Sequence, residues 1–188
     1  MQCRYRNKRI SWYKINLYII ILFVKMSFGN AEIIKIMTFN KNDLQKQILN
    51  KFVHIIYNNF YDLTKVVGSD HSIESIYIRL QSPDIVVLLA IHNDLILGYL
   101  IADRMQHNDM DLLHIYYLYV SNNHRNIGIA TYLLNKIDDY AHNLDVDAIS
   151  LTYDTYDKKL EKFYYNRKYE VNSRLRSFKR HDMLVKYV

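Results

Sequence analysis

The sequence is poor in cysteine, proline and glycine. Its 188 residues include one cysteine, Cys3, one proline and four glycines. A single thiol cannot form an internal disulfide or a zinc knuckle, which excludes disulfide-stapled secreted scaffolds and cysteine-rich metal modules. This cysteine usage fits the reducing cytosol, so we expect a cytoplasmic protein. Each glycine that is present is expected to stand where its backbone freedom is needed.

The chain also lacks the short signatures of several enzyme classes. It contains no GxxxxGK[ST] phosphate loop, no GxGxxG, no GxSxG nucleophile turn and no HExxH pair. Its eight histidines show no spacing typical of metal ligands, and we expect no metal. These absences argue against the usual forms of nucleoside triphosphatase, serine hydrolase and zinc protease.

The net charge of +6 belongs to one end of the chain. Residues 1–26 contain no acidic residue and six basic ones, namely Arg4, Arg6, Lys8, Arg9, Lys14 and Lys25. The other 19 basic residues balance the 19 acidic ones. Because the remainder is neutral and shows no helix-turn-helix or RNP pattern, we expect no nucleic-acid partner.

Residues 1–26 are set apart from the rest by this charge and by an apolar run, Ile15–Val24. The run is shorter than the roughly 20 residues that a membrane-spanning helix needs. Three interpretations stay open: an extension translated upstream of a start at Met26, an interfacial or membrane anchor, or a cleaved signal. We expect one domain over residues 27–188, with membrane contact only if the first segment is retained.

Hydrophobic patterning predicts an alternation of strands and helices. Predicted strands are Ile33–Phe39, Ile85–Ile91, Leu95–Arg104, Leu112–Val120, Ala148–Tyr153, Tyr169–Phe178 and Met183–Val188. Predicted helices begin at Asn42, at Ser69 or Asp70, at Gly128 and at Asp157, and an aromatic-rich loop or short helix covers Tyr57–Gly68. This order predicts an α/β (α+β) domain with a mixed sheet.

The most informative stretch is Leu118–Leu134, LYVSNNHRNIGIATYLL, where an apolar strand is followed by a polar loop and an amphipathic helix. Helix starts carry unpaired backbone N–H groups and the positive end of the helix dipole, so this loop can hold a phosphate. Gly128 and Ala130 leave the surface bare enough for close approach. Taken alone this signal is weak, because most strand-to-helix turns bind nothing.

Two motifs strengthen the prediction that this loop binds a phosphate. Arg125, Gly128 and Ala130 match the pattern [RQ]-x-x-G-x-[GA], five residues after an L-x-V ending at Val120. About 30 residues downstream, N-x-x-A-x-x-F-Y-x-x-x-G-F is echoed by Asp157, Leu160, Phe163, Tyr164, Lys168 and Tyr169. With these motifs at this spacing, residues 32–188 resemble the GNAT family of acetyl-CoA-dependent N-acetyltransferases.

The second motif departs from the family pattern at three positions. Asp157 replaces the usual Asn, Leu160 the usual Ala and Lys168 the usual Gly. The motif therefore depends chiefly on Phe163 and Tyr164. The turn before the next strand is expected to differ from that of the family.

The resemblance implies a mostly antiparallel mixed sheet of six to seven strands, flanked by about four helices, with the fourth and fifth strands splayed apart. It implies acetyl-CoA as co-substrate, with the pantetheine arm along Val120 and the pyrophosphate on the amides of residues 126–131. The implied cofactor-binding residues are Leu118, Tyr119, Val120, Arg125, Asn126, Ile127, Gly128, Ile129, Ala130, Thr131 and Asp157.

The family's chemistry is direct attack of a neutral amine on the thioester, with a base for the amine proton and an acid for the thiolate. Tyr164 matches the family tyrosine beside the sulfur and is the implied acid; it also reads as a core aromatic. His114 stands where many members carry a glutamate, and it is a candidate base, directly or through water. Its other interpretation is a packing residue, with Asp111, Tyr116 or solvent as the base.

Three further groups of side chains are candidates for contacts with CoA or with the acceptor. Lys158, Lys159, Lys162 or Arg167 could meet the 3′-phosphate of CoA, or lie on solvated faces. Asp103, Asp109 and Asp111 could attract a cationic amine. Tyr57, Phe60 and Tyr61 line either an acceptor site or the core.

The sequence thus predicts an N-acetyltransferase whose acceptor is a primary amine on a small molecule, a peptide N-terminus or a lysine. The protein is expected to be a monomer or a homodimer. The alternative function is a CoA-binding GNAT module without catalysis, which acts as a regulatory or interaction domain.

Overall fold

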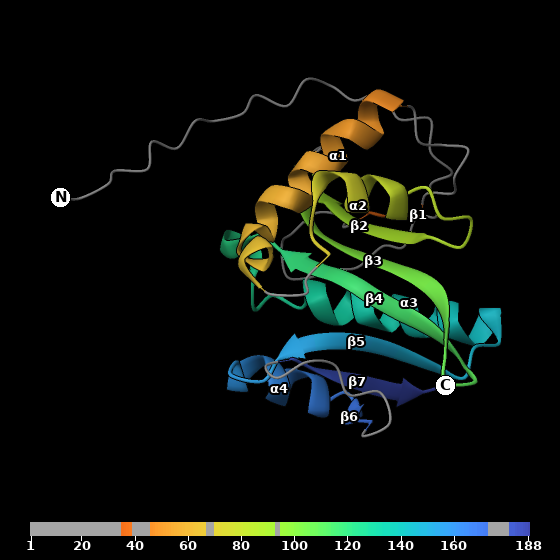
Figure 1. The fold of residues 1–188 in the computed structure, drawn as a ribbon. Coiled ribbons are helices and arrows are strands. Elements are labelled where there is room, and N and C mark those ends of the chain that lie inside the picture. The colour runs from red at the N-terminus through yellow and green to blue at the C-terminus, as the bar shows by residue number, and fades with distance from the viewer. Residues whose placement is uncertain (1–34, 39–45, 67–69, 93–94, 173–180) are drawn as a thin grey trace.

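The computed structural model describes residues 35–38, 46–66, 70–92, 95–172 and 181–188. Within these ranges the strands are β1 (Lys35–Thr38), β2 (Val86–His92), β3 (Leu95–His107), β4 (Met110–Val120), β5 (Ala148–Asp154), β6 (Glu170–Val171) and β7 (His181–Tyr187). The α-helices are α1 (Lys46–Asn59), α2 (Ile73–Arg79), α3 (Ile129–Leu144) and α4 (Lys158–Tyr165) (Figure 1). The predicted element order and fold class are confirmed.

The strands form one sheet in the order β1-β2-β3-β4-β5-β7-β6. Every neighbouring pair is antiparallel except β4 and β5, which are parallel. A parallel pair needs a crossover connection, and α3 supplies it between β4 and β5.

β4 and β5 separate partway along their length. Their pairing runs from Leu112 with Ala148 to Ile115 with Leu151. Beyond that point β4 continues to Val120 with β3 as its partner, and β5 continues to Asp154 with β7 as its partner. The expected splay of the fourth and fifth strands is therefore confirmed. It leaves backbone N–H and C=O groups on two facing strand edges without a strand partner.

A bulge lies at the same place. In the pairing of β3 with β4 the register shifts between Ile101 and Ala102, so that Tyr116 of β4 is an extra residue. Bulges bend a strand and increase its twist. The bulge therefore turns β4 where it leaves β5.

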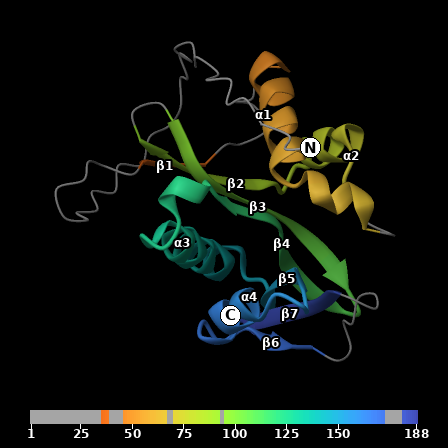
Figure 2. The ribbon, with the colours of Figure 1, turned by 90° about the vertical axis from the view of Figure 1, so that its left-hand side faces the viewer.

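Helices cover both faces of the sheet (Figure 2). The side chains of α3 and α4 pack on one face, in a core that includes Leu133 and Tyr164. Those of α1 and α2 pack on the other, in a core that includes Ile56 and Ile76. The apolar face predicted for the helix after Gly128 is buried as expected, at Ile129, Leu133, Leu134, Ile137 and Ala141.

The predicted start of α2 is wrong. Ser72, rather than Ser69 or Asp70, is the N-cap: its hydroxyl accepts from the N–H of Ser75 at 3.0 Å, and Ser75 Oγ accepts from the N–H of Ser72 at 2.9 Å. This reciprocal capping box satisfies two amides at once. Position 69 and the predicted cap at Asn42 lie outside the described residues.

Two further boundaries differ from prediction. The polar stretch expected between β3 and β4 is a tight hairpin, in which Asn108 and Asp109 have φ of 47° and 63°. Two consecutive left-handed residues give the turn that suits twisted antiparallel strands. Tyr169 precedes β6 and is buried against Tyr164, with ring centroids 5.6 Å apart. Residues 173–178 of the strand predicted there lie outside the described residues.

The described part of the chain contains no helix that is long and apolar enough to cross a membrane. Residues 1–26, on which the anchor and signal interpretations depend, are not among those described.

Candidate active site

The loop between β4 and α3 is shaped by its own backbone and by Arg125. The Ser121 N–H donates to the carbonyl of Leu97 at 2.8 Å, which holds the start of the loop against β3. Arg125 Nε donates to the carbonyl of Val120 at 3.0 Å. Asn126 and Gly128 then adopt left-handed conformations, with φ of 64° and 93°. The loop thus folds back over the end of β4 before the helix begins.

The start of α3 is bare, in the sense that no side chain caps its first amides. Gly128 is its N-cap and offers no side chain to accept from the first amides, and the first turn holds no acidic residue. The first bond back along the helix is from the N–H of Tyr132 to the carbonyl of Gly128, at 2.9 Å. The amides before it lack an intrahelical acceptor and lie at the positive end of the dipole. The residues present therefore fit a pyrophosphate.

Arg167 brings a positive charge to this helix start. Its Nη2 donates to the hydroxyl of Thr131, and its guanidinium lies 4.2 Å above the ring centroid of Phe163. Its Nε is buried and has no hydrogen-bond partner among the described residues. Lys158 instead pairs with Glu161, while Lys159 and Lys162 are exposed. Of the four cations weighed from the sequence, Arg167 is the one that contacts the predicted phosphate loop.

Gly98, which the sequence analysis did not single out, packs against the splayed end of β4. A Cβ at this position would lie 2.7 Å from the carbonyl oxygen of Tyr119 and 3.1 Å from Cγ2 of Ile129. Only glycine allows β3 to approach this backbone and the helix start so closely. The low glycine content of the chain was the signal that could have identified it.

Tyr164 is buried on α4 and faces the core below α3. Its ring meets those of Phe163 and Tyr169 edge-on, with centroids 5.3 and 5.6 Å away. Burial raises its pKa well above the ordinary value for tyrosine, so the hydroxyl keeps its proton. A protonated hydroxyl is the form that a proton donor requires.

The second motif builds the ends of α4. Asp157 is the N-cap, and its Oδ1 accepts from the N–H groups of Lys159 and Leu160 at 3.1 and 2.9 Å. At the other end Lys168 has φ of 65°. The lysine thus adopts the left-handed conformation that glycine adopts most easily, so this substitution does not prevent a left-handed turn there.

His114 lies on β4 opposite Ser150 of β5, in the paired part of the two strands. Its Nδ1 is 2.9 Å from Ser150 Oγ, and its ring is edge-on to Tyr116 with centroids 4.7 Å apart. Burial, reinforced by the charges of Arg79 and His107, lowers its pKa to about 4. The ring is therefore neutral near pH 7.

The alternative bases are engaged elsewhere. Asp111 accepts two hydrogen bonds from Arg104 Nε and a further one from its Nη2, and this contact lowers the pKa of the carboxyl. The guanidinium of Arg79 lies 3.7 Å from the ring centroid of Tyr116, whose pKa burial raises. Asp111 is thus held as a charged partner of Arg104.

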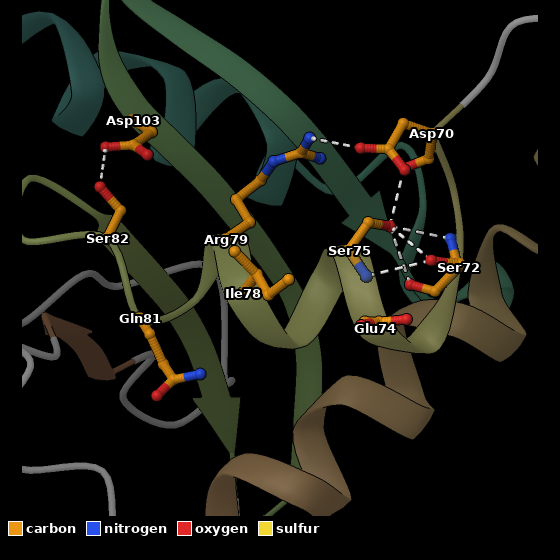
Figure 3. A pocket seen from close by; sticks show the side chains of 9 residues that line it. All are labelled: Asp70, Ser72, Glu74, Ser75, Ile78, Arg79, Gln81, Ser82 and Asp103. Atoms are coloured by element: carbon orange, nitrogen blue, oxygen red, sulfur yellow. Dashed lines mark hydrogen bonds and ion pairs between the residues drawn. The ribbon is translucent and has the colours of Figure 1, made fainter.

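A shallow groove of about 730 Å³ runs between α2, the turn after it and β3 (Figure 3). It is lined by Asp70, Ser72, Glu74, Ser75, Ile78, Arg79, Gln81, Ser82 and Asp103. Asp103 is the cross-strand partner of His114, so the groove and His114 share one face of the sheet. Ser82 donates to Asp103 at 2.9 Å, and burial raises the pKa of this carboxyl.

The acidic residues weighed as an amine attractant are not brought together. Asp103 lines the groove, Asp109 lies in the hairpin turn and Asp111 pairs with Arg104. The carboxylates that share the groove with Asp103 are Asp70 and Glu74 of the α2 region. Sequence reasoning missed these two because they come from a different part of the chain.

The aromatic group of Tyr57, Phe60 and Tyr61, at the end of α1 and just after it, divides between core and surface. The ring of Phe60 packs against those of Tyr99, Tyr117 and Tyr119, with centroids 5.1 to 6.5 Å away. Tyr61 is 52% exposed. Among the described residues, no group of three or more His, Cys, Asp or Glu side chains could hold a metal ion.

A sequence model described as the Acetyltransferase (GNAT) family matches residues 52–168, more than half of the chain. The chain therefore belongs to the GNAT family of acetyltransferases. The match includes β4, the loop with its bare helix start, and Tyr164. No curated protein sequence matches the chain significantly.

Solved acetyltransferase structures share the fold. NAA60 of Arabidopsis thaliana, in complex with a bisubstrate analogue, matches with 16% identity and a TM-score of 0.59 over 81% of this chain and 97% of that one. The PaiA N-acetyltransferase of Thermoplasma acidophilum, in complex with coenzyme A, matches with 17% identity and a TM-score of 0.58 over 82% and 99%. An aminoglycoside acetyltransferase from an uncultured soil metagenomic sample, in complex with sisomicin, matches with 20% identity and a TM-score of 0.58 over 78% and 94%.

Proposed function

We propose that the protein transfers an acetyl group from acetyl-CoA to a primary amine. The observation that carries this proposal is the bare start of α3 beside two strand edges that have separated. The amides offer an anion site, and the strand edges offer hydrogen bonds to an extended amide-containing arm. Membership of the GNAT family and the folds of PaiA with coenzyme A and NAA60 with a bisubstrate analogue support it.

The residues proposed to hold the co-substrate follow the chain from β4 into α3. Leu118, Tyr119 and Val120 present the free edge of β4, and the amides of residues 126–131 face the pyrophosphate. Arg125 fixes the loop through the Val120 carbonyl, and Arg167 adds positive charge at Thr131. Asp157 belongs to the proposal as the cap that fixes α4, and with it Tyr164. When bound, acetyl-CoA supplies the activated acetyl group as a thioester.

Tyr164 and His114 are proposed to handle the protons of the transfer. Tyr164 keeps its proton because it is buried, and it donates that proton to the leaving thiolate. His114 is neutral near pH 7, so it has an unprotonated ring nitrogen, and it is proposed to accept the amine proton directly or through water. The same low pKa means that His114 releases the proton readily to solvent.

The groove along α2 favours an acceptor with positive charge. Asp70, Glu74 and Asp103 outnumber the single cation in its lining, Arg79. A primary amine is cationic near pH 7, and carboxylates at the entrance raise its local concentration. The acceptor is proposed to be an amine on a small molecule, a peptide N-terminus or a lysine side chain.

A CoA-binding module without catalysis is the second candidate. It is favoured by the absence of a carboxylate at position 114 and by the low pKa of the histidine there. Such a module would bind acetyl-CoA with the same loop and release no thiol.

One experiment separates the two. The protein is incubated with acetyl-CoA and a panel of amines: a diamine, a peptide with a free N-terminus and a blocked peptide with one lysine. An active transferase releases CoA thiol only in the presence of its acceptor and loses most of that release in Tyr164→Phe. Binding of acetyl-CoA without thiol release from any acceptor supports the module.

A further inference from the structure

His71 and Tyr117 form a buried hydrogen-bonded pair on the face of the sheet that carries His114 and the groove. His71 precedes α2, and its Nδ1 is 3.0 Å from the hydroxyl of Tyr117 on β4. Its Nε2 is 3.2 Å from the carbonyl oxygen of Tyr57 on α1. The ring stacks on that of Tyr57, with centroids 5.5 Å apart and planes 7° from parallel. The pair thus joins α1, the segment before α2, and β4.

The direction of each hydrogen bond follows from the groups themselves. A carbonyl oxygen only accepts, so Nε2 of the neutral His71 ring must carry the proton. Nδ1 then has the lone pair and accepts from the Tyr117 hydroxyl. Burial raises the pKa of Tyr117, and the nearby positive charge of Arg79 lowers it in part. Both donors therefore point the same way, from Tyr117 to His71 and from His71 to the end of α1.

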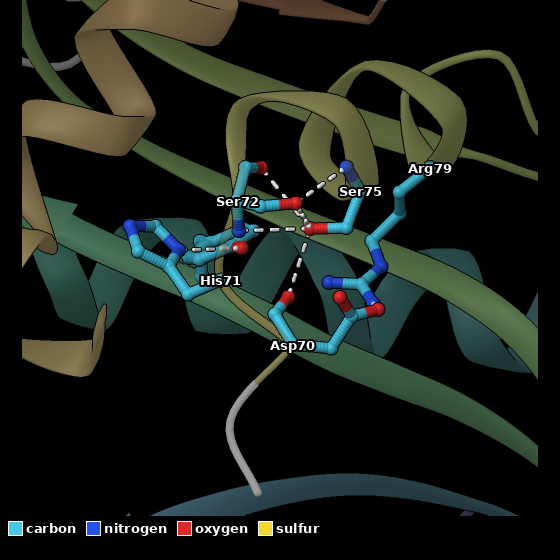
Figure 4. Close-up of polar contacts among 6 residues, drawn as sticks. Asp70, His71, Ser72, Ser75 and Arg79 are labelled. Carbon is cyan, nitrogen blue, oxygen red and sulfur yellow. Dashed lines mark hydrogen bonds and ion pairs between the residues drawn. The ribbon is translucent and has the colours of Figure 1, made fainter. Parts of the chain in front are cut away.

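Tyr117 stands where the chemistry is proposed to occur. It follows the β-bulge at Tyr116 and precedes Leu118, in the part of β4 that has left β5. Its ring packs on the face of the sheet that α1 and α2 cover, and the groove lies on the same face. Arg79, whose guanidinium lies beside the Asp70 carboxylate (Figure 4), lines the groove.

We propose that Tyr117 and His71 carry the amine proton away from the reacting centre, as a route besides His114. As the C–N bond forms, an N–H bond of the amine breaks and its proton moves to the Tyr117 oxygen. The O–H bond of Tyr117 breaks in the same step, and that proton binds to Nδ1 of His71. Tyr117 ends neutral and His71 ends as an imidazolium, which returns the proton to solvent. The electron pair of the C–S bond leaves on sulfur, which takes its proton from Tyr164, and the Tyr164 oxygen then regains a proton from solvent.

The surroundings of His71 are defined by a few groups. Tyr57 of α1 presents its carbonyl and its ring, Phe60 just after α1 presents its ring, and Tyr117 is the contact from β4. The charged groups near the pair are Arg79 of α2 and Asp70, whose carboxylate is 3.9 Å from the Arg79 guanidinium. Asp70 therefore offsets the positive charge of Arg79 when His71 gains its own.

The relay rests on the proposed acetyl transfer, and variants test it through the pH dependence of kcat/KM. The assay uses acetyl-CoA and the best acceptor of the three-amine panel. His71→Gln keeps a donor for Tyr57 and an acceptor for Tyr117 but cannot take up a proton, and Tyr117→Phe removes the relay hydroxyl. Each should lower kcat/KM about 100-fold near pH 7 and remove the same acidic limb from the profile. His54→Gln, an exposed histidine of α1, is the matched control and should change neither.

The protonation of His71 supplies a readout that needs no turnover. Nitrogen NMR of the imidazole in the free protein should show Nε2 protonated and Nδ1 bare, and Tyr117→Phe should shift the Nδ1 signal. A ring protonated at Nδ1 overturns the relay. An acidic limb that is unchanged in both variants, in a protein that turns over, also overturns the relay and leaves the transferase intact. A protein that binds acetyl-CoA and acetylates none of the amines defeats both proposals.

Discussion

Ile115 and Leu151 are the last residues that β4 and β5 pair, although both strands continue beyond them. This register fixes where the two strand edges become free. The last paired residue of β4 is one position after the histidine proposed as a base and two positions before the tyrosine proposed as a relay. The bulge at Tyr116 turns β4 at the same point. The geometry of the site therefore depends on where one parallel pairing stops.

Gly128→Ala should weaken both the fold and the binding of acetyl-CoA. The residue has φ of 93°, a conformation that costs an L-residue about 1–2 kcal/mol. The new methyl group would also cover the bare helix start. Chemical denaturation should show the loss of stability, and calorimetric titration with acetyl-CoA should show a rise in Kd of at least several-fold. Asn126→Gly relaxes the other left-handed position and should leave stability within about 0.5 kcal/mol of wild type. Equal affinities for Gly128→Ala and wild type would contradict the assignment of this loop.

Gly98→Ala should destabilise the protein through a clash with backbone. Its Cβ would lie 2.7 Å from the Tyr119 carbonyl oxygen, so β3 and β4 would have to move apart. Overpacking of this kind costs about 1–3 kcal/mol. The expected result is a lower Tm, with weaker acetyl-CoA binding because the edge of β4 shifts. Leu95→Ala, at an exposed position of the same strand, should change the Tm little. An unchanged Tm for Gly98→Ala would show that the strands separate freely here.

Tyr164→Phe should lower kcat by about 10²–10⁴ while the Kd for acetyl-CoA stays near that of wild type. The change removes one hydroxyl and keeps the ring that packs against Phe163 and Tyr169. Because burial raises the pKa of Tyr164, the wild-type rate should not fall at the pH where an exposed tyrosine ionises. Rapid-mixing assays of thiol release measure the first effect and the pH profile measures the second. Full activity in the phenylalanine variant would show that Tyr164 serves only as an aromatic residue of the core.

Burial of neutral His114 should make the fold less stable in acid. Its folded pKa of about 4 lies below the ordinary value near 6.5, so the unfolded chain binds a proton first as the pH falls. Stability is therefore full above about pH 6.5 and falls between there and about pH 4, by an amount of order 3 kcal/mol.

Urea unfolding at a series of pH values measures this dependence. His114→Gln cannot titrate and should flatten the decline over that range, whereas His54→Gln should follow the wild-type curve. A decline of equal size in His114→Gln would show that other groups cause it.

The order of the elements could be predicted because local patterns determine it. The apolar stripe of α3 repeats at helical spacing, and the predicted strand Ile85–Ile91 is continuously apolar because both of its faces are covered. The loop of residues 125–131 could also be predicted, since a glycine directly before an amphipathic helix can be recognised in the sequence. These features need no knowledge of distant residues.

The other features depend on contacts that local patterns do not encode. Ser150 lies 36 residues from His114 and His71 lies 46 residues from Tyr117, and each pair meets through strand register or helix packing. Asp70 and Glu74 join Asp103 in the groove for the same reason. The Ser72 cap was missed because three neighbouring polar residues offer similar caps, and the reciprocal bond with Ser75 decides between them.

The most direct test follows acetyl transfer and thiol release together. Mass spectrometry of the three-amine panel, with acetyl-CoA labelled in its acetyl group, counts labelled amide while a thiol reagent counts free CoA. We predict equal amounts of both products from at least one amine, and loss of both in Tyr164→Phe. Saturable binding of acetyl-CoA with no labelled amide, and no thiol above the rate without protein, would contradict it.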